Sequence, residues 1–237
     1  MPEVKTTYHF PEGEVLLFNK ELNWTSFDVV NKVRYNLCQK LGIKKLKVGH
    51  AGTLDPLATG LIILCTGKAT KRIEEIQQQE KEYIATLKIG ATTPSYDLET
   101  EEDSSADYKH VTKELIELAL QKFIGEINQV PPVFSAVKIK GKRAFDYARN
   151  GEEIELQAKK IVIHKITLEQ FELPFIQIRV NCGKGTYIRA LARDIGEELN
   201  CGAYLTALER TKIGSFNVSD AFTVESFLEN LVTGESK

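Results

Sequence analysis

A glycine-rich loop followed by a hydrophobic run constrains this chain more than any other stretch of its sequence. The loop spans residues 49–60, which read GHAGTLDPLATG and carry His50 and Asp55. Pro56 disfavours helical geometry at Asp55, and the glycines allow backbone conformations that other residues avoid. The apolar run 61–65 predicts a buried strand, which gives the loop a rigid support. The pattern therefore predicts an active-site loop that aims one carboxylate.

Size and composition indicate an ordinary globular protein. The chain has 237 residues, of which 42% are hydrophobic, enough for a sizeable core. It shows no apolar run of about 18 residues and no secretory-signal layout, so we expect a soluble, cytoplasmic protein with no membrane partner. The cysteines lack CxxC pairs and neighbouring histidines, which predicts reduced core thiols, no disulfide framework and no metal site. They are Cys38, Cys65, Cys182 and Cys201.

Charge is segregated along the chain although the net charge is only -2. Six cations and no acid lie between Val29 and Leu54, directly before the motif loop, and six acids and no base lie between Asp97 and Asp107. The cations are Lys32, Arg34, Lys40, Lys44, Lys45 and Lys47. A charged run is commonly a solvated surface, but beside a constrained carboxylate it favours a polyanionic substrate.

Hydrophobic periodicity predicts an irregular mixture of helices and strands. Strands are expected at 14–19, 81–90, 159–171, 175–182 and 203–213, and helices from Thr25 to Gly42 and at 68–79, 112–124, 187–199 and 224–231. The first helix opens with a capping box, and its expected core stripe is Phe27, Val30, Val33, Leu37 and Leu41. This mixture predicts an α+β fold with a mixed, mainly antiparallel sheet flanked by helices. No linker or repeat divides the chain, so we expect one domain over residues 1–237.

Arg189 is a candidate partner for Asp55. It lies one turn into a helix that follows the glycine-rich turn 183–186, from where it can reach back over strand ends. Such a pair would favour the ionised carboxylate, although an arginine on an amphipathic helix is often a plain surface cation. The turn lacks the spacing of nucleotide-binding loops. His50 has no second histidine at ligand spacing, which favours stacking or hydrogen bonding beside Asp55 over a metal.

Five motifs, in order, resemble those of the TruB family of tRNA pseudouridine synthases, which modify uridine 55 in the T loop. They cover roughly residues 14–220, and motifs that recur in order are far more specific than any one alone. The motifs are LFNK with WTS in 17–26, GHAGTLDPLATG in 49–60, KEY in 81–83, PPVFSAVKIKGKRAFDYAR in 131–149 and CGKGTYIR in 182–189. The resemblance implies the pseudouridine synthase fold, with a central active-site cleft.

The same resemblance assigns roles to individual residues. It makes Asp55 the catalytic aspartate, Arg189 its salt-bridge partner, and Tyr83 the aromatic residue that stacks on the target base and is implicated in proton removal. The residues it implies for RNA binding are His50, which helps to hold the flipped-out base, Lys20 of the first motif, and Tyr187 and Leu208 at the base pocket.

The implied chemistry is an isomerisation, so no cofactor is expected. The bond between uracil N1 and ribose C1′ breaks, the base rotates, and C5 bonds to C1′. One carboxylate serves either of two routes, attack on C1′ or removal of the 2′ proton, and these alternatives stay open. The target base is buried in the T loop and must be extruded. The basic segments 32–47 and 138–149 would contact phosphates of the tRNA.

Two departures from the family pattern stand out. The chain ends soon after Leu231, whereas family members of common length continue into a PUA-type RNA-binding domain, so that domain is expected to be missing or vestigial. Residues 91–97 follow the family's version loosely, which leaves the role of Asp97 open.

Three other functions compete with this reading. A guide-RNA-dependent synthase of the same superfamily is disfavoured by the missing C-terminal domain. A non-catalytic tRNA-binding or tRNA-folding protein is disfavoured by the intact Asp55, Tyr83 and Arg189. A glycosidase-like hydrolase would need a second placed carboxylate. We expect a monomer with no obligate protein partner.

Overall fold

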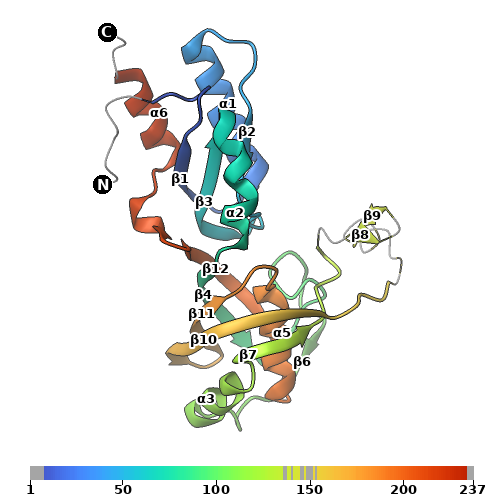
Figure 1. The fold of residues 1–237 in the computed structure, drawn as a ribbon. Coiled ribbons are helices and arrows are strands. Elements are labelled where there is room, and N and C mark those ends of the chain that lie inside the picture. Colours follow the sequence, from blue (N-terminus) through green and yellow to red (C-terminus); the bar gives the residue numbers. More distant parts are fainter. Residues whose placement is uncertain are drawn as a thin grey trace. The chain divides into compact units, whose positions relative to one another are not determined.

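The chain folds into two compact units, which we describe separately. The computed structural model describes residues 8–135, 138–139, 141–144, 147, 152 and 154–233. Unit 1 comprises residues 1–83 and 209–237, and unit 2 comprises residues 84–208. Strands β4 (Lys81–Ile89) and β12 (Ala203–Ile213) belong to both units (Figure 1). The mixture of helices and mostly antiparallel strands confirms the predicted fold class.

Unit 1 is built around the predicted strand that follows the motif loop. This strand, β3, pairs antiparallel with β1 on one side, where Phe18 lies opposite Ile62, and β2 pairs with its far end. The strand order continues from β3 to β12 and β4. The unit's elements are β1 (Val15–Lys20), α1 (Ser26–Leu41), β2 (Val48–His50), β3 (Ala58–Thr66), the 3-10 helix η1 (Gly67–Arg72), α2 (Ile73–Gln78), β13 (Phe216–Asn217), the 3-10 helix η2 (Val218–Asp220) and α6 (Val224–Thr233).

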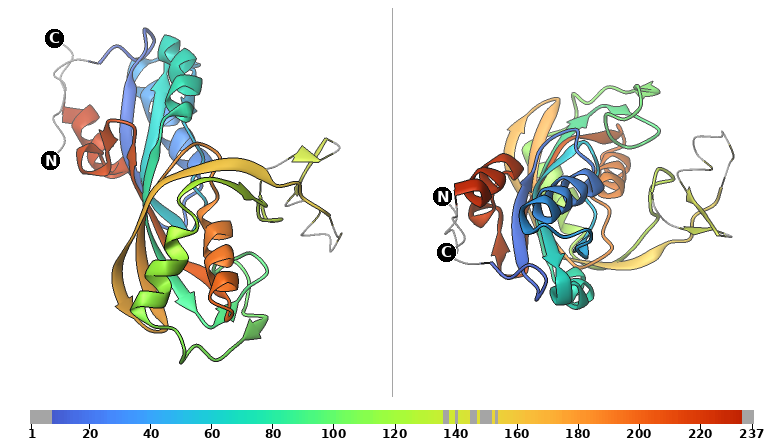
Figure 2. Two further views of the ribbon diagram at one scale, coloured as in Figure 1. Left: turned by 60° about the horizontal axis from the view of Figure 1, so that its bottom comes forward. Right: turned by 90° about the horizontal axis from the view of Figure 1, so that it is seen from above.

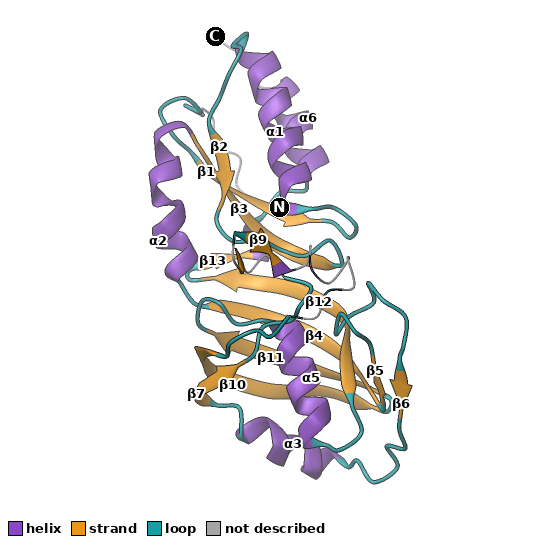
Figure 3. Ribbon diagram, turned by 90° about the vertical axis from the view of Figure 1, so that its right-hand side faces the viewer, coloured by secondary structure: helices purple, strands orange, loops and turns teal. Residues whose placement is uncertain are grey.

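Both faces of β3 are buried, which explains its unbroken apolar sequence. Ile62 and Leu64 join a core that includes residues of α1 and α6, such as Phe227. Leu61 and Ile63 face the other way, into a second core that contains Ile76 of α2. Figure 3 shows α1 and α6 side by side, with α2 apart from them. A strand covered on both faces cannot shift its register without moving one set of side chains out of its core.

Helix α1 confirms the predicted caps but corrects the predicted stripe. The Thr25 side chain accepts from Asp28 N while the Asp28 carboxylate accepts from Thr25 N, and Gly42 ends the helix in the left-handed conformation. Phe27 and Leu41 were expected in the core but are 59% and 38% exposed. Val30, Val33 and Leu37 are buried as predicted, and Val29 joins them in place of Phe27 and Leu41, so the buried face of the helix lies slightly to one side of the predicted one.

Two further element predictions needed correction. The helix expected at 68–79 is divided into η1 and the shorter helix α2, with Arg72 and Ile73 at the junction. Strand β7 (Gly125–Gln129) was not predicted, because its sequence GEINQ carries no alternating apolar pattern.

Unit 2 places a helix against an antiparallel sheet whose order runs β12, β4, β11, β10, β7. The long hairpin of β10 and β11 pairs Ile166 with Val180, and Figure 2 shows the curvature of these strands. Helix α5 lies along the sheet in Figure 3 and buries Ile188, Leu191 and Ile195. The remaining elements are β5 (Ala91–Thr92), β6 (Ser104–Ser105), α3 (Lys113–Gln121), β8 (Lys138–Ile139), β9 (Lys142–Arg143), β10 (Lys159–Glu172), β11 (Phe175–Cys182) and α5 (Ile188–Glu198). Within the described part of the chain, no helix has the length and apolar character needed to span a membrane.

A substitution at Gly60 tests whether β3 and β12 must approach each other closely. Its φ is +99°, and an added Cβ would lie 2.4 Å from the carbonyl oxygen of Arg210. We expect Gly60→Ala to lower the free energy of unfolding by more than about 2 kcal/mol, because backbone cannot move aside cheaply. Urea denaturation measures this. Gly42→Ala is the matched control, since Gly42 has φ +62° but nothing within 4 Å of the added Cβ. Equal losses in the two variants would contradict the close approach.

Candidate active site

Asp55 lies, as the sequence predicted, in the loop between β2 and β3, three residues before a strand that is buried on both faces. Asp55 itself is half-buried. The preceding residue, Leu54, is fixed by α1, because the Ser26 hydroxyl donates to Leu54 O at 3.0 Å and accepts from Leu54 N at 2.8 Å. On the other side, Asn23 N donates to Pro56 O at 2.9 Å. The backbone on both sides of the carboxylate is therefore held from outside the loop.

Lys20 lies beneath this loop as a fully buried cation at the end of β1. Its side chain is 0% exposed, and Nζ donates to three carbonyl oxygens, of Glu21 at 2.9 Å, Trp24 at 2.7 Å and Pro56 at 3.3 Å. Burial lowers the pKa of Lys20 to about 8, while the Asp55 carboxylate acts to raise it. In the structure, Lys20 thus ties the Asp55–Pro56 turn to the β1–α1 connection. Its expected role in RNA binding stays a prediction.

Arg210 is a second buried cation that the sequence analysis did not identify. It is 1% exposed and lies on β12, from where Nε donates to Leu61 O at 2.8 Å. Its Nη atoms donate to Thr53 O at 3.4 Å and to Gly52 O at 3.1 Å. Arg210 therefore joins the start of β3 to the loop just before Asp55. The only sequence signal is an arginine within the predicted strand 203–213, where an unpaired charge would be costly if the strand is buried.

His50 is brought close to the same loop at the end of β2. Burial lowers its pKa below the ordinary histidine value, the Gly52 backbone opposes this shift, and the Arg210 guanidinium lowers the pKa further. The neutral imidazole is therefore favoured at neutral pH. Its Nδ1 is buried and has no hydrogen-bond partner among the described residues, which leaves a polar atom that a ligand can satisfy.

Tyr83 is the last residue of β4 that belongs to unit 1, and it is buried. The strand is fixed there by its neighbour Glu82, whose carboxylate and carbonyl oxygens accept from the Thr211 hydroxyl at 2.7 and 3.3 Å. The Glu82 carboxylate also pairs with Lys212 at 3.3 Å.

Arg189 lies in unit 2, in the first turn of α5, and is 5% exposed. Its Nε lies 3.5 Å from the Asp97 carboxylate, Nη1 donates to Ser95 O at 3.3 Å and Nη2 donates to Phe134 O at 2.9 Å. The alternative of a plain surface cation is therefore wrong. Asp97, whose role the sequence left open, is a buried partner of Arg189. The ion pair between Arg189 and Asp55 stays a prediction.

Tyr187 and Leu208, the two remaining predicted residues, are both half-buried in unit 2. Tyr187 is the N-cap of α5. Its backbone is held by Gln129, which accepts from Tyr187 N at 2.9 Å and donates to Tyr187 O at 3.2 Å. Leu208 lies on β12 at the edge of unit 2.

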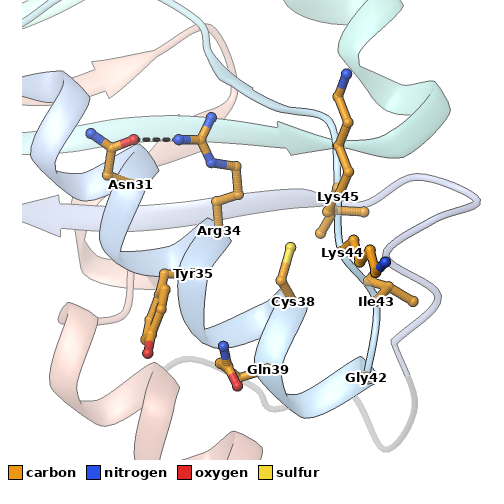
Figure 4. A pocket seen from close by; sticks show the side chains of 10 residues that line it. Asn31, Arg34, Tyr35, Cys38, Gln39, Gly42, Ile43, Lys44 and Lys45 are labelled. Atoms are coloured by element: carbon orange, nitrogen blue, oxygen red, sulfur yellow. Dashed lines mark hydrogen bonds between the residues drawn. The ribbon is translucent and has the colours of Figure 1, made fainter.

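Three cations of the predicted run line a groove on α1, which we call the α1 groove. Its lining includes Arg34, Tyr35 and Cys38 of the helix and Lys44 and Lys45 of the following segment (Figure 4). Arg34 donates to the Asn31 side chain at 2.6 Å. In the described residues no acid pairs with Arg34, Lys44 or Lys45, and Tyr35 is 64% exposed. Exposed cations beside an exposed aromatic ring suit a nucleic-acid backbone and its bases.

Two other predictions concern the rest of the chain. Within the basic segment 138–149, residues 140, 145–146 and 148–149 lie outside the described residues, and the expected phosphate contacts of this segment stay a prediction. Over the ranges that the structure describes, no group of three or more His, Cys, Asp or Glu side chains is arranged to hold a metal ion.

Comparison with known proteins gives the class of the fold and then the family. A chain in a solved Cbf5-Nop10-Gar1 complex matches with a TM-score of 0.70 at 27% identity, over 93% of this chain and 55% of that one. The chain thus spans about half the length of that solved protein. A structure of an H/ACA RNP bound to a substrate RNA matches with a TM-score of 0.66 at 24% identity, over 93% of this chain and 53% of that one. That second likeness concerns the fold alone.

Sequence comparison is more specific. Residues 39–188 match the TruB family pseudouridylate synthase (N terminal domain), and residues 189–237 match the tRNA pseudouridylate synthase B C-terminal domain. The tRNA pseudouridine synthase B of Phocaeicola vulgatus is 65% identical over 221 residues, 93% of this chain and 94% of that protein. The enzyme of the same name from Flavobacterium johnsoniae is 52% identical over 227 residues, 95% and 99% of the two chains. The chain belongs to the TruB family of pseudouridylate synthases, which are isomerases.

The buried Lys20 predicts a specific dependence of stability on pH. Its pKa of about 8 in the folded state lies below the ordinary 10.5, so the unfolded chain binds more protons between these values. The contribution of Lys20 to stability therefore rises as the pH increases from about 8 to 10.5, by up to about 3 kcal/mol. Urea unfolding of the wild type and of Lys20→Met across this range measures the difference. A constant difference would contradict the lowered pKa, as would an ordinary pKa in a ¹³Cε titration of Lys20.

Proposed function

We propose that this protein converts uridine 55 in the T loop of tRNA to pseudouridine, in the cytoplasm and without a cofactor. The observation that carries the proposal is the 65% identity with a tRNA pseudouridine synthase B over nearly the whole of both chains. The loop that holds Asp55 supports it, because two buried cations and α1 fix the loop backbone. The α1 groove supports a polyanionic substrate.

The proposed reaction begins when the target base is extruded from the T loop, where Tyr83 and His50 replace its stacking and hydrogen-bonding partners. Asp55 then acts at the ribose, either as a nucleophile on C1′ or as a base for the 2′ proton, while the N1–C1′ bond breaks. The base rotates and C5 bonds to C1′. In the first route this breaks the bond between Asp55 and C1′, and in the second route Asp55 returns the proton to C2′. The C5 proton is then removed, a step that involves Tyr83, and N1 is protonated, so the product is an isomer of the substrate.

Charged neighbours explain why an aspartate suits this role. Lys20 lies close enough to interact electrostatically with Asp55, and in our proposal Arg189 supplies a further positive charge. Both cations favour the anionic carboxylate that either route requires. Tyr187 and Leu208 line the base pocket in this proposal, and phosphates of the T arm lie along the α1 groove.

The alternatives are weaker on the same evidence. A guide-RNA-dependent synthase is disfavoured because the 65% identity is with a protein named tRNA pseudouridine synthase B. A tRNA-binding protein without catalysis gives no reason for the elaborate support of the Asp55 loop. We further propose that the protein acts as a single domain and as a monomer.

Replacing the carboxylate tests the catalytic assignment. We expect Asp55→Asn to lower the single-turnover rate on unmodified T-arm RNA by more than about 10³-fold, because a neutral amide serves as neither nucleophile nor base. The dissociation constant for the RNA should change less than about threefold. Chemical adduct mapping of pseudouridine gives the rate, and Asp220→Asn, at an exposed acid of unit 1, is the control. Retained turnover would remove Asp55 from catalysis, and a wild type inactive at this uridine would overturn the proposed function.

Salt dependence tests the α1 groove. If Lys44 and Lys45 each neutralise one phosphate, the double variant Lys44→Gln/Lys45→Gln should reduce the steepness of the fall of log K with log salt concentration by about 1.5, where K is the association constant for the RNA. The single-turnover rate at saturating RNA should not change. Filter binding between about 50 and 300 mM salt measures the slope. Lys68→Gln is the matched control, because Lys68 is exposed and paired with Glu12. A slope equal to that of the wild type would show that RNA does not occupy the groove.

A further inference from the structure

The orientation of Arg189 depends on one short turn of unit 2. Ser95 supplies a carbonyl oxygen to Nη1, and Asp97 supplies its carboxylate to Nε. The other carboxylate oxygen of Asp97 accepts from Glu99 N at 2.9 Å. The Asp97 carbonyl accepts from the Thr93 hydroxyl at 2.8 Å. The orientation of the Arg189 guanidinium therefore depends on the conformation of this turn.

Tyr96, between these two residues, has an unfavourable backbone conformation. Its φ is +61°, and the described residues other than glycine that share a positive φ are Asn23 and Asn200. Asparagine tolerates the left-handed region, whereas a bulky aromatic residue there costs about 1 kcal/mol or more. Such strain persists only where the surroundings over-determine it.

The surroundings of Tyr96 supply that restraint. Its ring lies 5.0 Å from the Arg193 guanidinium, centroid to carbon. Its backbone N donates to Thr93 O at 3.1 Å, and its carbonyl accepts from Leu205 N at 3.0 Å. A guanidinium over a tyrosine ring contributes about 0.5–2 kcal/mol, which is comparable to the backbone cost.

Arg193 is itself fixed in place. Its Nε donates to the Asp194 carboxylate at 2.8 Å, and Nη2 donates to Val130 O at 3.2 Å. Residues four apart share a face of an α-helix, so Arg189 and Arg193 project from one side of α5. Each of them donates to a carbonyl of the segment 130–134, Arg193 at Val130 and Arg189 at Phe134.

We propose that Tyr96 and Arg193 are positioning residues for Arg189. The stack of the Tyr96 ring on the Arg193 guanidinium holds the 95–97 turn in the strained conformation in which both Ser95 O and the Asp97 carboxylate meet Arg189. Without the ring, residue 96 relaxes to a negative φ, and these two partners move away from the guanidinium. The inference rests on the proposed function only for the catalytic importance of Arg189.

A series at residue 96 tests this with rates. In Tyr96→Ala, a positive φ at residue 96 is still unfavourable, but the ring that holds it is gone. This variant should lower the single-turnover rate by about 10²-fold, since small displacements of positioning groups have effects of this size. Tyr96→Asn also lacks the ring but tolerates a positive φ, so it should recover about tenfold of that loss. Tyr96→Phe keeps the ring and should remain within about twofold of the wild type.

Variants on α5 and the opposite hairpin complete the series. Arg193→Met keeps an apolar stem but loses the cation, and we expect it to match Tyr96→Ala. Arg179→Met is the control, because Arg179 forms a half-exposed ion pair with Glu169 in the same unit. The RNA dissociation constants and melting temperatures should remain near those of the wild type. A general loss of structure would instead lower the rate and the melting temperature together, with no recovery in Tyr96→Asn.

A second measurement needs no RNA. In ¹⁵N-arginine-labelled protein, the Nε–H signal of Arg189, assigned with Arg189→Lys, should exchange with solvent about tenfold or more faster in Tyr96→Ala and Arg193→Met. It should be unchanged in Arg179→Met. Wild-type rates and unchanged exchange in the test variants would overturn the positioning role. If the wild type forms no pseudouridine in the T loop, the proposed function fails, and the exchange rates still decide this inference.

Discussion

The burial of two cations beneath one loop is the interaction on which unit 1 depends. Removing a charge from water costs several kcal/mol, and Lys20 and Arg210 offset this cost with hydrogen bonds to backbone carbonyls rather than to acids. Those carbonyls belong to the loop around Asp55, to the start of β3 and to the β1–α1 connection. The same contacts therefore shape the loop and leave positive charge near its carboxylate, so geometry and electrostatics cannot be altered separately. A neutral residue at either position would leave several buried carbonyl groups without donors.

Much of the fold follows from local sequence. The capping box at Thr25, the left-handed Gly42 and the apolar run of β3 each specify their structure through contacts within a few residues. The errors arise where tertiary packing decides. Phe27 has the correct helical spacing for the core, but the orientation of α1 against the sheet leaves it exposed. Strand β7 forms through its pairing with β10, which its own sequence does not indicate.

The candidate site divides in the same way. The loop around Asp55 was predictable because proline, glycine and a following strand act locally. The glycine-rich turn 183–186 indicated Arg189, and the resemblance to a family added Tyr83. The partners of these groups were not predictable. Arg210 reaches a loop more than 150 residues earlier in the chain, and Asp97 meets Arg189 only because the sheet of unit 2 brings α5 and the 95–97 turn together. No periodicity or spacing in one sequence encodes such pairs.

The position of Cys38 in the α1 groove has a practical consequence. Cys65, Cys182 and Cys201 are buried, whereas Cys38 is half-buried, and burial raises the pKa of Cys65 and Cys201 above the ordinary thiol value. Because the thiolate is the reactive form, alkylating reagents meet Cys38 first among the cysteines of the native chain. A small fluorophore attached there stands among Arg34, Lys44 and Lys45. The native sequence thus already provides an attachment site, Cys38, for a fluorophore that reports on binding in this groove.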